Sequence, residues 1–222
     1  MGSSGILLGG SFKQIPVTGT LEDWEKSTRE GRDKTTETAT FFTQSGEPIT
    51  GFMGDEHSVH IDPKYLQVSG GVLTHNHPDN DFGGTLSMQD IKIFADSQLS
   101  EIRAYTEQGQ AYSLKVGKNA DRDALKRWVK TNQKLMQQNF ARSYKSAYKQ
   151  ATTPLKSGPH KGQIKLVNRR TGKIVYRQPM TDAQATRYAR QYSVGAFDRM
   201  YQKNLSKFGF TYTATKAKNI YG

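Results

Sequence analysis

The stretch at residues 71–78 constrains the fold of this chain more than any other feature. It reads Gly-Val-Leu-Thr-His-Asn-His-Pro, an apolar run that ends in two histidines and is stopped by a proline. A short run of this kind is typical of a buried strand, and Pro78 ends it because proline cannot donate to the hydrogen-bond ladder of a sheet. Side chains two residues apart on a strand point to the same face. We therefore expect His75 and His77 to project side by side from the end of a buried strand.

A helix after the next loop supplies a third polar side chain. Ser87 is suited to cap a helix, and apolar side chains then recur at helical spacing over residues 88–100, with Asp90 in the first turn. Two imidazoles and a carboxylate suit a divalent metal, and catalytic zinc sites have three protein ligands and an open position. The chain has no cysteine, so any metal must be held by His, Asp or Glu. We expect His75, His77 and Asp90 to bind zinc.

Hydrolysis at such a metal needs a carboxylate that does not bind it. This group takes a proton from the activated water and passes it to the leaving amine. Residues 36–42 are rich in threonine and phenylalanine, and after a Ser-Gly turn residues 49–53 resume the pattern, which predicts a β-hairpin. Glu37, on the first strand of this hairpin, could lie beside the histidine strand. We assign Glu37 as the general base, with Glu30 and Glu47 as the alternatives nearby in the sequence.

An upstream glutamate, then His-x-His-Pro, then Ser-x-x-Asp at a helix start resembles the JAMM (JAB/MPN) zinc metallopeptidases, most closely their bacterial and phage branches. The resemblance covers residues 35–116. It implies a mixed β-sheet flanked by helices, related in architecture to zinc deaminases. It also implies hydrolysis of a peptide or isopeptide bond, often in a ubiquitin-like protein, with Ser87 polarising the scissile carbonyl or stabilising its oxyanion. The loop between His77 and Ser87 is longer than in the family pattern. We expect this difference to affect the identity of the substrate more than the binding of the metal.

Other metal enzymes fit the sequence less well. Zinc deaminases of the H-x-E type need a pair of cysteines, which the chain lacks, and the HExxH motif of helical zinc peptidases is absent. The letters His-Asn-His suggest an HNH nuclease, but such nucleases spread these residues over a longer ββ-metal motif. A metal-dependent nuclease remains the third alternative.

Charge divides the chain into regions. Residues 1–114 hold 8 Lys and Arg against 16 Asp and Glu, whereas residues 115–222 hold 24 against 4. Such a split suggests regions with different partners. We divide the chain into an N-terminal segment (residues 1–34), a metallopeptidase core (residues 35–116) and a basic extension of helix, hairpin and helix (residues 117–222).

The basic extension is suited to an anionic partner. Its cations alternate with aromatic side chains, a composition typical of phosphate contacts, and an acidic protein would select the same composition. A solvated basic face without a partner is the third reading. The alternative function of the chain is therefore that of a nucleic-acid-binding phage or mobile-element protein that keeps the core as a scaffold. Trp128, Phe140 and Tyr144 fit core packing better than base stacking. The candidate binding residues are Lys165, Arg169, Arg170, Lys173 and Arg177.

The sequence also bears on localisation. No apolar run approaches the ~20 residues of a membrane-spanning helix, and the first residues lack a signal-peptide pattern. We expect a soluble protein with no membrane partner. The resemblance fits the cytoplasm of a bacterium or phage-infected cell, or a secreted toxin without a conventional signal peptide.

Overall fold

The computed structural model describes residues 5–29, 35–56, 58–78, 85–106, 110–167 and 173–215. The chain forms two compact units: the first contains Met1–Gln133 and Asp198–Gly222, and the second contains Lys134–Phe197. Two long helices, α3 (Arg122–Thr152) and α4 (Asp182–Leu205), each contribute to both units. This division differs from the boundary that we expected at residue 116, because the first part of α3 belongs to the first unit and the chain returns to that unit within α4, at Asp198.

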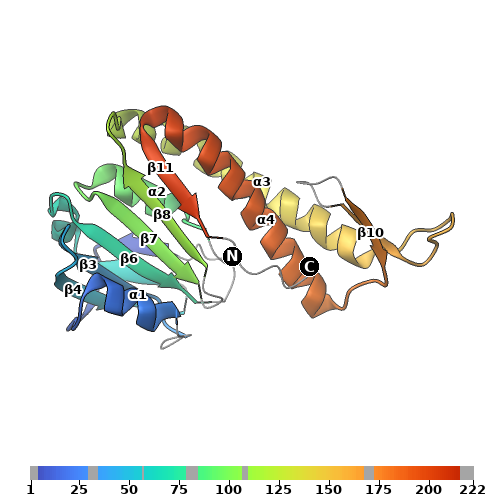
Figure 1. Cartoon of the computed structure of the whole chain (residues 1–222), viewed down its shortest axis with the longest axis horizontal. Helices are drawn as coiled ribbons and strands as arrows, with labels where there is room; N and C mark the ends of the chain where they lie inside the picture. The colour runs from blue at the N-terminus through green and yellow to red at the C-terminus, as the bar shows by residue number, and fades with distance from the viewer. Residues whose placement is uncertain are drawn as a thin grey trace. The chain divides into compact units, whose positions relative to one another are not determined.

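A seven-stranded mixed β-sheet forms the body of the first unit (Figure 1), so the expected α/β fold is confirmed. The strand order is β11-β8-β7-β6-β3-β4-β2, with β6 and β7 parallel and the other neighbours antiparallel. The strands are β2 (Lys13–Ile15), β3 (Thr38–Phe42), β4 (Pro48–Met53), β6 (Val72–His77), β7 (Glu101–Thr106), β8 (Ala111–Val116) and β11 (Phe210–Ala214).

Helices α1 and α2 cover opposite faces of this sheet (Figure 1). On one face, Glu25 of α1 (Leu21–Arg29) forms an ion pair with Arg103 of β7. On the other face lies α2 (Met88–Asp96), which contacts the first strand of a parallel pair. This pair joins β1 (Gly5–Leu8) to β5 (Ser58–Ile61), and a 3-10 turn, η1 (Pro63–Gln67), follows it.

Strand β6 is buried along its whole length. It has a neighbour on each side, β3 and β7, and a helix layer over each face of the sheet. Only Val72 and Leu73 of this strand are apolar, so its second half buries polar side chains. Large side chains on both sides of it are fully buried, and each contributes about 1.5–3 kcal/mol through burial. They include Phe41, Ile91, Phe94 and Ile102, and Leu73 of β6 itself is also fully buried.

The C-terminal segment contains a strand that the expected order of helix, hairpin and helix did not include. Helix α4 ends at Leu205, a short 3-10 turn follows, and β11 then pairs with β8. Phe210 and Tyr212 are buried while Thr211 and Thr213 point outward. This alternation gives β11 one apolar face. The Phe210 ring on that face packs on Phe94, with 5.8 Å between the two ring centroids.

The second unit is smaller and centres on an antiparallel hairpin, as predicted. Strand β9 (Ile164–Val167) pairs with β10 (Ile174–Arg177). Ala151, Ile164, Met180 and Ala185 form its buried cluster, against which Tyr148, Leu166 and Tyr188 pack. Among the helices that the structure describes, none combines the length and apolar character that a membrane crossing needs.

The three aromatic side chains of α3 that the sequence singled out are half-buried and contact other aromatic rings. Trp128 contacts Tyr201 and Phe208 in the first unit, and Phe140 contacts Phe197 in the second. Tyr144 stacks on Tyr148 of the same helix.

Candidate metal centre

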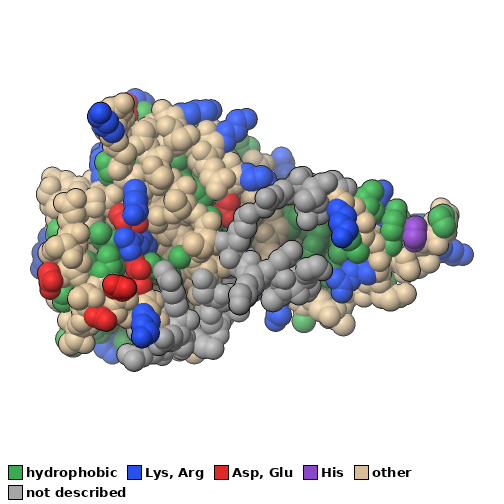
Figure 2. Space-filling view, in the orientation of Figure 1, with side chains coloured by type: hydrophobic (Ala, Val, Ile, Leu, Met, Phe, Trp, Pro, Cys, Tyr) green, Lys and Arg blue, Asp and Glu red, His purple; other side chains and the backbone are tan. Residues whose placement is uncertain are grey.

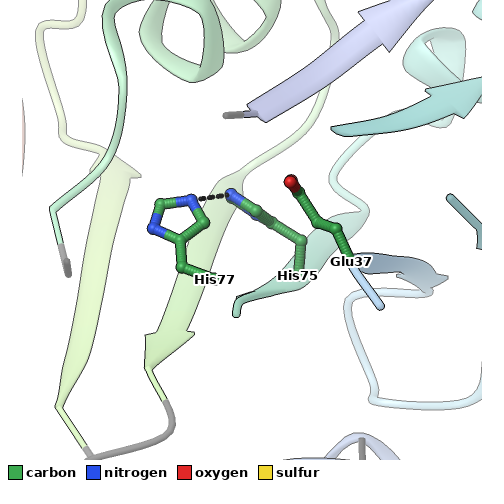
Figure 3. Close-up of side chains that lie close together, drawn as sticks. All are labelled: Glu37, His75 and His77. Carbon is green, nitrogen blue, oxygen red and sulfur yellow. Dashed lines mark hydrogen bonds between the residues drawn. The ribbon is translucent and has the colours of Figure 1, made fainter. Parts of the chain in front are cut away.

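Strand register places Glu37, His75 and His77 on one face of the sheet. Ala39 is directly opposite His75 in the β3–β6 ladder, and side chains two residues apart share a face. Glu37 lies just before β3, where its N–H donates to the Asp55 carbonyl at 2.6 Å. Figure 3 shows the result: the Glu37 carboxyl group lies beside the imidazole of His75, which in turn meets His77.

The two histidines and Asp90 converge on one point. The Nε2 atoms of His75 and His77 are 2.9 Å apart, and Oδ2 of Asp90 lies 3.4 Å from the first and 3.7 Å from the second. The three side chains are buried. Ligand atoms at ~2.0–2.1 Å from a tetrahedral zinc ion are about 3.3 Å from each other. The observed separations bracket this value, so these three side chains could share one metal ion.

The start of α2 fixes the direction of Asp90. The capping box expected at this helix is present: the Asp90 N–H donates to Ser87 Oγ at 3.1 Å, and the Ser87 N–H donates to Asp90 Oδ2 at 2.7 Å. The backbone N–H of Ile6, on β1, approaches Oδ1 at 3.4 Å. Outer partners of this kind orient a metal ligand. The contribution of Ile6 had no signal in the sequence.

Burial and mutual charge set the protonation of the centre. Burial would raise the pKa of the Asp90 carboxyl, but the charge and hydrogen bonding of His75 and His77 hold that pKa well below its ordinary value. Burial lowers the pKa of His77, and the nearby His75 lowers it further, while Asp90 opposes this shift. A deprotonated carboxylate and a neutral imidazole are the forms that bind a metal.

Two carboxylates therefore border the histidine pair. Oxygen and ring nitrogen atoms of Glu37, His75 and His77 all lie within 4.8 Å of one another, so this buried group could itself hold a metal ion. Asp90 meets both ring nitrogens through Oδ2, and the Ser87 N–H holds that oxygen in place. Each carboxylate therefore lies close enough to the two imidazoles either to bind a metal with them or to exchange a proton through one water molecule.

A second polar network joins the C-terminal segment to the turn that precedes α2. The Tyr212 hydroxyl donates to Asp198 Oδ1 at 2.6 Å and lies 2.7 Å from Thr85 Oγ1. Thr85 precedes the cap residue Ser87 by two positions, so this network anchors the turn that leads into α2. Burial raises the pKa of Tyr212, and the charge of Asp198 raises it further, which keeps the hydroxyl protonated.

Tyr201 of α4 interacts electrostatically with Asp90 of the centre. It is fully buried, and its pKa is raised well above the ordinary value, first by burial and then by the charges of Asp90 and Asp198. Neither tyrosine was predicted from the sequence as part of the site. The alternating pattern at residues 210–213 was the available signal for Tyr212, and Tyr201 had none.

The remaining predicted residues fall elsewhere. Ser87 is half-buried at the entry to α2, and the loop at residues 79–84 lies outside the described residues. The five candidate cations all belong to the second unit. Lys165, Lys173 and Arg177 are exposed there, and Arg169 and Arg170 lie outside the described residues.

Comparison of the chain with models of protein families, with curated proteins and with solved structures finds no match in any of the three.

Proposed function

We propose that this protein is a zinc-dependent metallopeptidase of the JAMM type, which hydrolyses a peptide or isopeptide bond. The observation that carries the proposal is the convergence of two imidazole nitrogens and one carboxylate oxygen within 3.7 Å in a buried site. Glu37 lies beside them as a further buried carboxylate. Metal ligands and a separate proton carrier are the two parts that hydrolysis requires.

Zinc suits the donor set, because it accepts imidazole nitrogen and carboxylate oxygen in a tetrahedral arrangement. His75, His77 and Asp90 would hold the ion. When bound there, zinc would lower the pKa of a water molecule, so that the water could lose a proton and act as the nucleophile. It would also polarise the carbonyl group of the substrate.

Glu37 and Ser87 would carry the remaining steps. Glu37 takes a proton from the water as the water oxygen bonds to the carbonyl carbon, and it delivers that proton to the leaving nitrogen as the C–N bond breaks. The Ser87 Oγ atom accepts a hydrogen bond from the Asp90 N–H, so its own hydrogen can be donated to the carbonyl oxygen. A donor of this kind at an oxyanion contributes about 10²–10³ in kcat.

The first test is the metal content of protein purified without a metal-chelating column. We expect about one zinc ion per chain, as catalytic sites of this type bind, and its loss in the His75→Ala/His77→Ala double variant. His60→Ala is the matched control, because His60 belongs to β5 and its Nδ1 contacts the Gly9 carbonyl instead. Wild-type protein that neither contains nor takes up zinc would rule out the proposal.

Glu37→Gln separates the two roles of the carboxylates. We expect this variant to keep its zinc and to lose hydrolysis of a peptide library and of isopeptide-linked ubiquitin-like conjugates. Asp90→Ala should lose the metal. Loss of zinc in Glu37→Gln, with zinc retained in Asp90→Ala, would exchange the two assignments.

A further inference from the structure

The second unit carries the entire net charge of the chain. Residues 134–197 contain 13 Lys and Arg and a single acidic residue, Asp182, a net charge of +12 that equals the value for the whole protein. The first unit contains 19 of each sign. Asp182 is already bonded to Tyr148. The unit therefore cannot neutralise its cations from within, and an anionic partner would do so.

One face of the β9–β10 hairpin is exposed and carries mixed chemistry. Tyr176 is directly opposite Lys165, so the two side chains share a face, and Ile174 joins them two residues away. All three are exposed. The opposite face carries Ile164 and Leu166, which pack into the buried cluster of the unit. Figure 2 shows apolar and cationic side chains side by side over this part of the molecule.

An aromatic stack is already built on the exposed face. The rings of His160 and Tyr176 lie parallel within 8°, with centroids 3.6 Å apart. The His160 Nδ1 atom lies 3.1 Å from Gln163 Oε1, which fixes the orientation of the imidazole. This spacing is close to the ~3.4 Å between successive bases of a nucleic-acid strand. The pair can therefore continue a stack of bases.

We propose that this face, formed by Lys165, Ile174, Tyr176 and His160, binds single-stranded nucleic acid. Exposed aromatic rings stack on unpaired bases, and surrounding cations hold the phosphates, which is the general mode of sequence-tolerant single-strand binding. A duplex hides the faces of its bases, and an acidic peptide offers charge without flat rings. The inference is independent of the proposed peptidase activity, because it uses no residue of the metal centre.

The test is fluorescence polarisation of the full chain with a labelled mixed-sequence DNA strand of about 20 nucleotides, longer than a typical single-strand site. Tyr176→Ala should weaken binding about 5- to 150-fold, the loss expected for one stacked base, and Tyr176→Phe should bind like the wild type. Tyr176 is exposed, so the variant is expected to fold, which circular dichroism would verify.

Salt dependence separates stacking from phosphate contacts. Lys165→Gln should reduce the slope of log affinity against log salt by about 0.7, the value for one phosphate contact on a single strand, and Tyr176→Ala should leave the slope unchanged. Lys118→Gln makes the same charge change on an exposed residue of the first unit and should alter neither quantity.

Three outcomes would overturn the proposal. They are the absence of salt-sensitive binding to the single strand, equal affinity for a duplex of the same length or for polyglutamate, and equal binding by Tyr176→Ala and the wild type. Each leaves the zinc content and peptidase assays untouched, so this inference and the proposed function can fail separately.

Discussion

The two units of this protein differ in where their charged side chains lie and in how far these charges balance. In the described parts of the chain, the buried ionisable acids and histidines are Glu37, His75, His77, Asp90 and Glu101, and all five belong to the first unit. That unit balances its Lys and Arg with an equal number of acids. The second unit has nearly all of one sign, and its described Lys and Arg side chains are not among the buried residues.

The difference shows how each unit can be disturbed. A buried charge is costly unless its partners are held in place, so the first unit depends on the positions of single atoms. Surface charges act through their sum and are screened by salt, so the second unit depends on total charge and ionic strength. Matched substitutions in the two units should therefore have different effects.

The largest contrast is expected between two glycines. Gly209 (φ 78°) turns the chain into β11, and a Cβ there would lie 2.3 Å from the Asn119 carbonyl oxygen. Gly158 of the second unit has a similar φ of 84° but open space around it. Gly158→Ala should lower the free energy of unfolding by about 1–2 kcal/mol, the cost of the left-handed conformation. Gly209→Ala should cost about 4 kcal/mol or more, because backbone must also move.

Urea denaturation followed by circular dichroism would measure both losses. Similar values for the two variants would show that the C-terminal strand adjusts its path, and that the first unit is less tightly built around the metal centre than its contacts indicate.

Local patterns explain what could be predicted from the sequence. Strand β6, the cap of α2, the β3–β4 hairpin and the β9–β10 hairpin of the basic extension were each predicted from a short stretch of sequence, and the structure contains all of them. His75 and His77 share a face because of strand periodicity, and the capping box aims Asp90 at them. The predicted helix at residues 88–100 ends earlier, at Asp96, because the Ser97 backbone and side chain both bond to the Phe94 carbonyl.

Long-range pairings explain what could not be predicted. Ile6 reaches Asp90 across 84 residues, and Thr85 reaches Tyr212 across 127. Strands β1, β2 and β11 are short, and each lies in a stretch whose pairing partner is distant in the sequence. No periodicity within such a stretch identifies that partner. The contacts that Ile6 and Tyr212 make around the site therefore could not be predicted from the sequence.

The Thr85–Tyr212–Asp198 network should give an intermediate effect. Tyr212→Phe removes the hydroxyl that joins Thr85 to Asp198 and leaves both groups short of a partner, which should cost about 1–3 kcal/mol of stability. Because Thr85 anchors the turn before Ser87, zinc affinity should also fall, by about 10-fold as for weak outer-shell losses. Competition with a fluorescent zinc chelator would measure it.

Tyr112→Phe is the control for this network. The Tyr112 hydroxyl donates to Gln110 at 3.0 Å, in the turn before β8, and should not influence zinc affinity. An unchanged affinity in Tyr212→Phe, together with lower stability, would restrict the network to a structural role.

The smallest predicted effects are changes in the free energy of unfolding that have opposite signs in the two units. In α2, Lys92 pairs with Asp96 at 2.9 Å, so Lys92→Glu should lower the free energy of unfolding by about 0.5 kcal/mol, since like charges four residues apart repel. In α3, exposed Lys145 lies between Arg142 and Lys149, three and four residues away. Lys145→Glu should therefore raise that free energy by about 0.5 kcal/mol.

Salt decides whether charge is the cause of this contrast. Exposed charges interact over about 10 Å at 0.1 M salt and about 3 Å at 1 M, so both effects should shrink toward zero in urea titrations at the higher concentration. A Lys145→Glu variant that is destabilised at low salt would mean that the cations of the second unit do not repel one another appreciably. The excess charge would then no longer imply a need for an anionic partner. The aromatic stack would be the only remaining support for the proposed binding face on the hairpin.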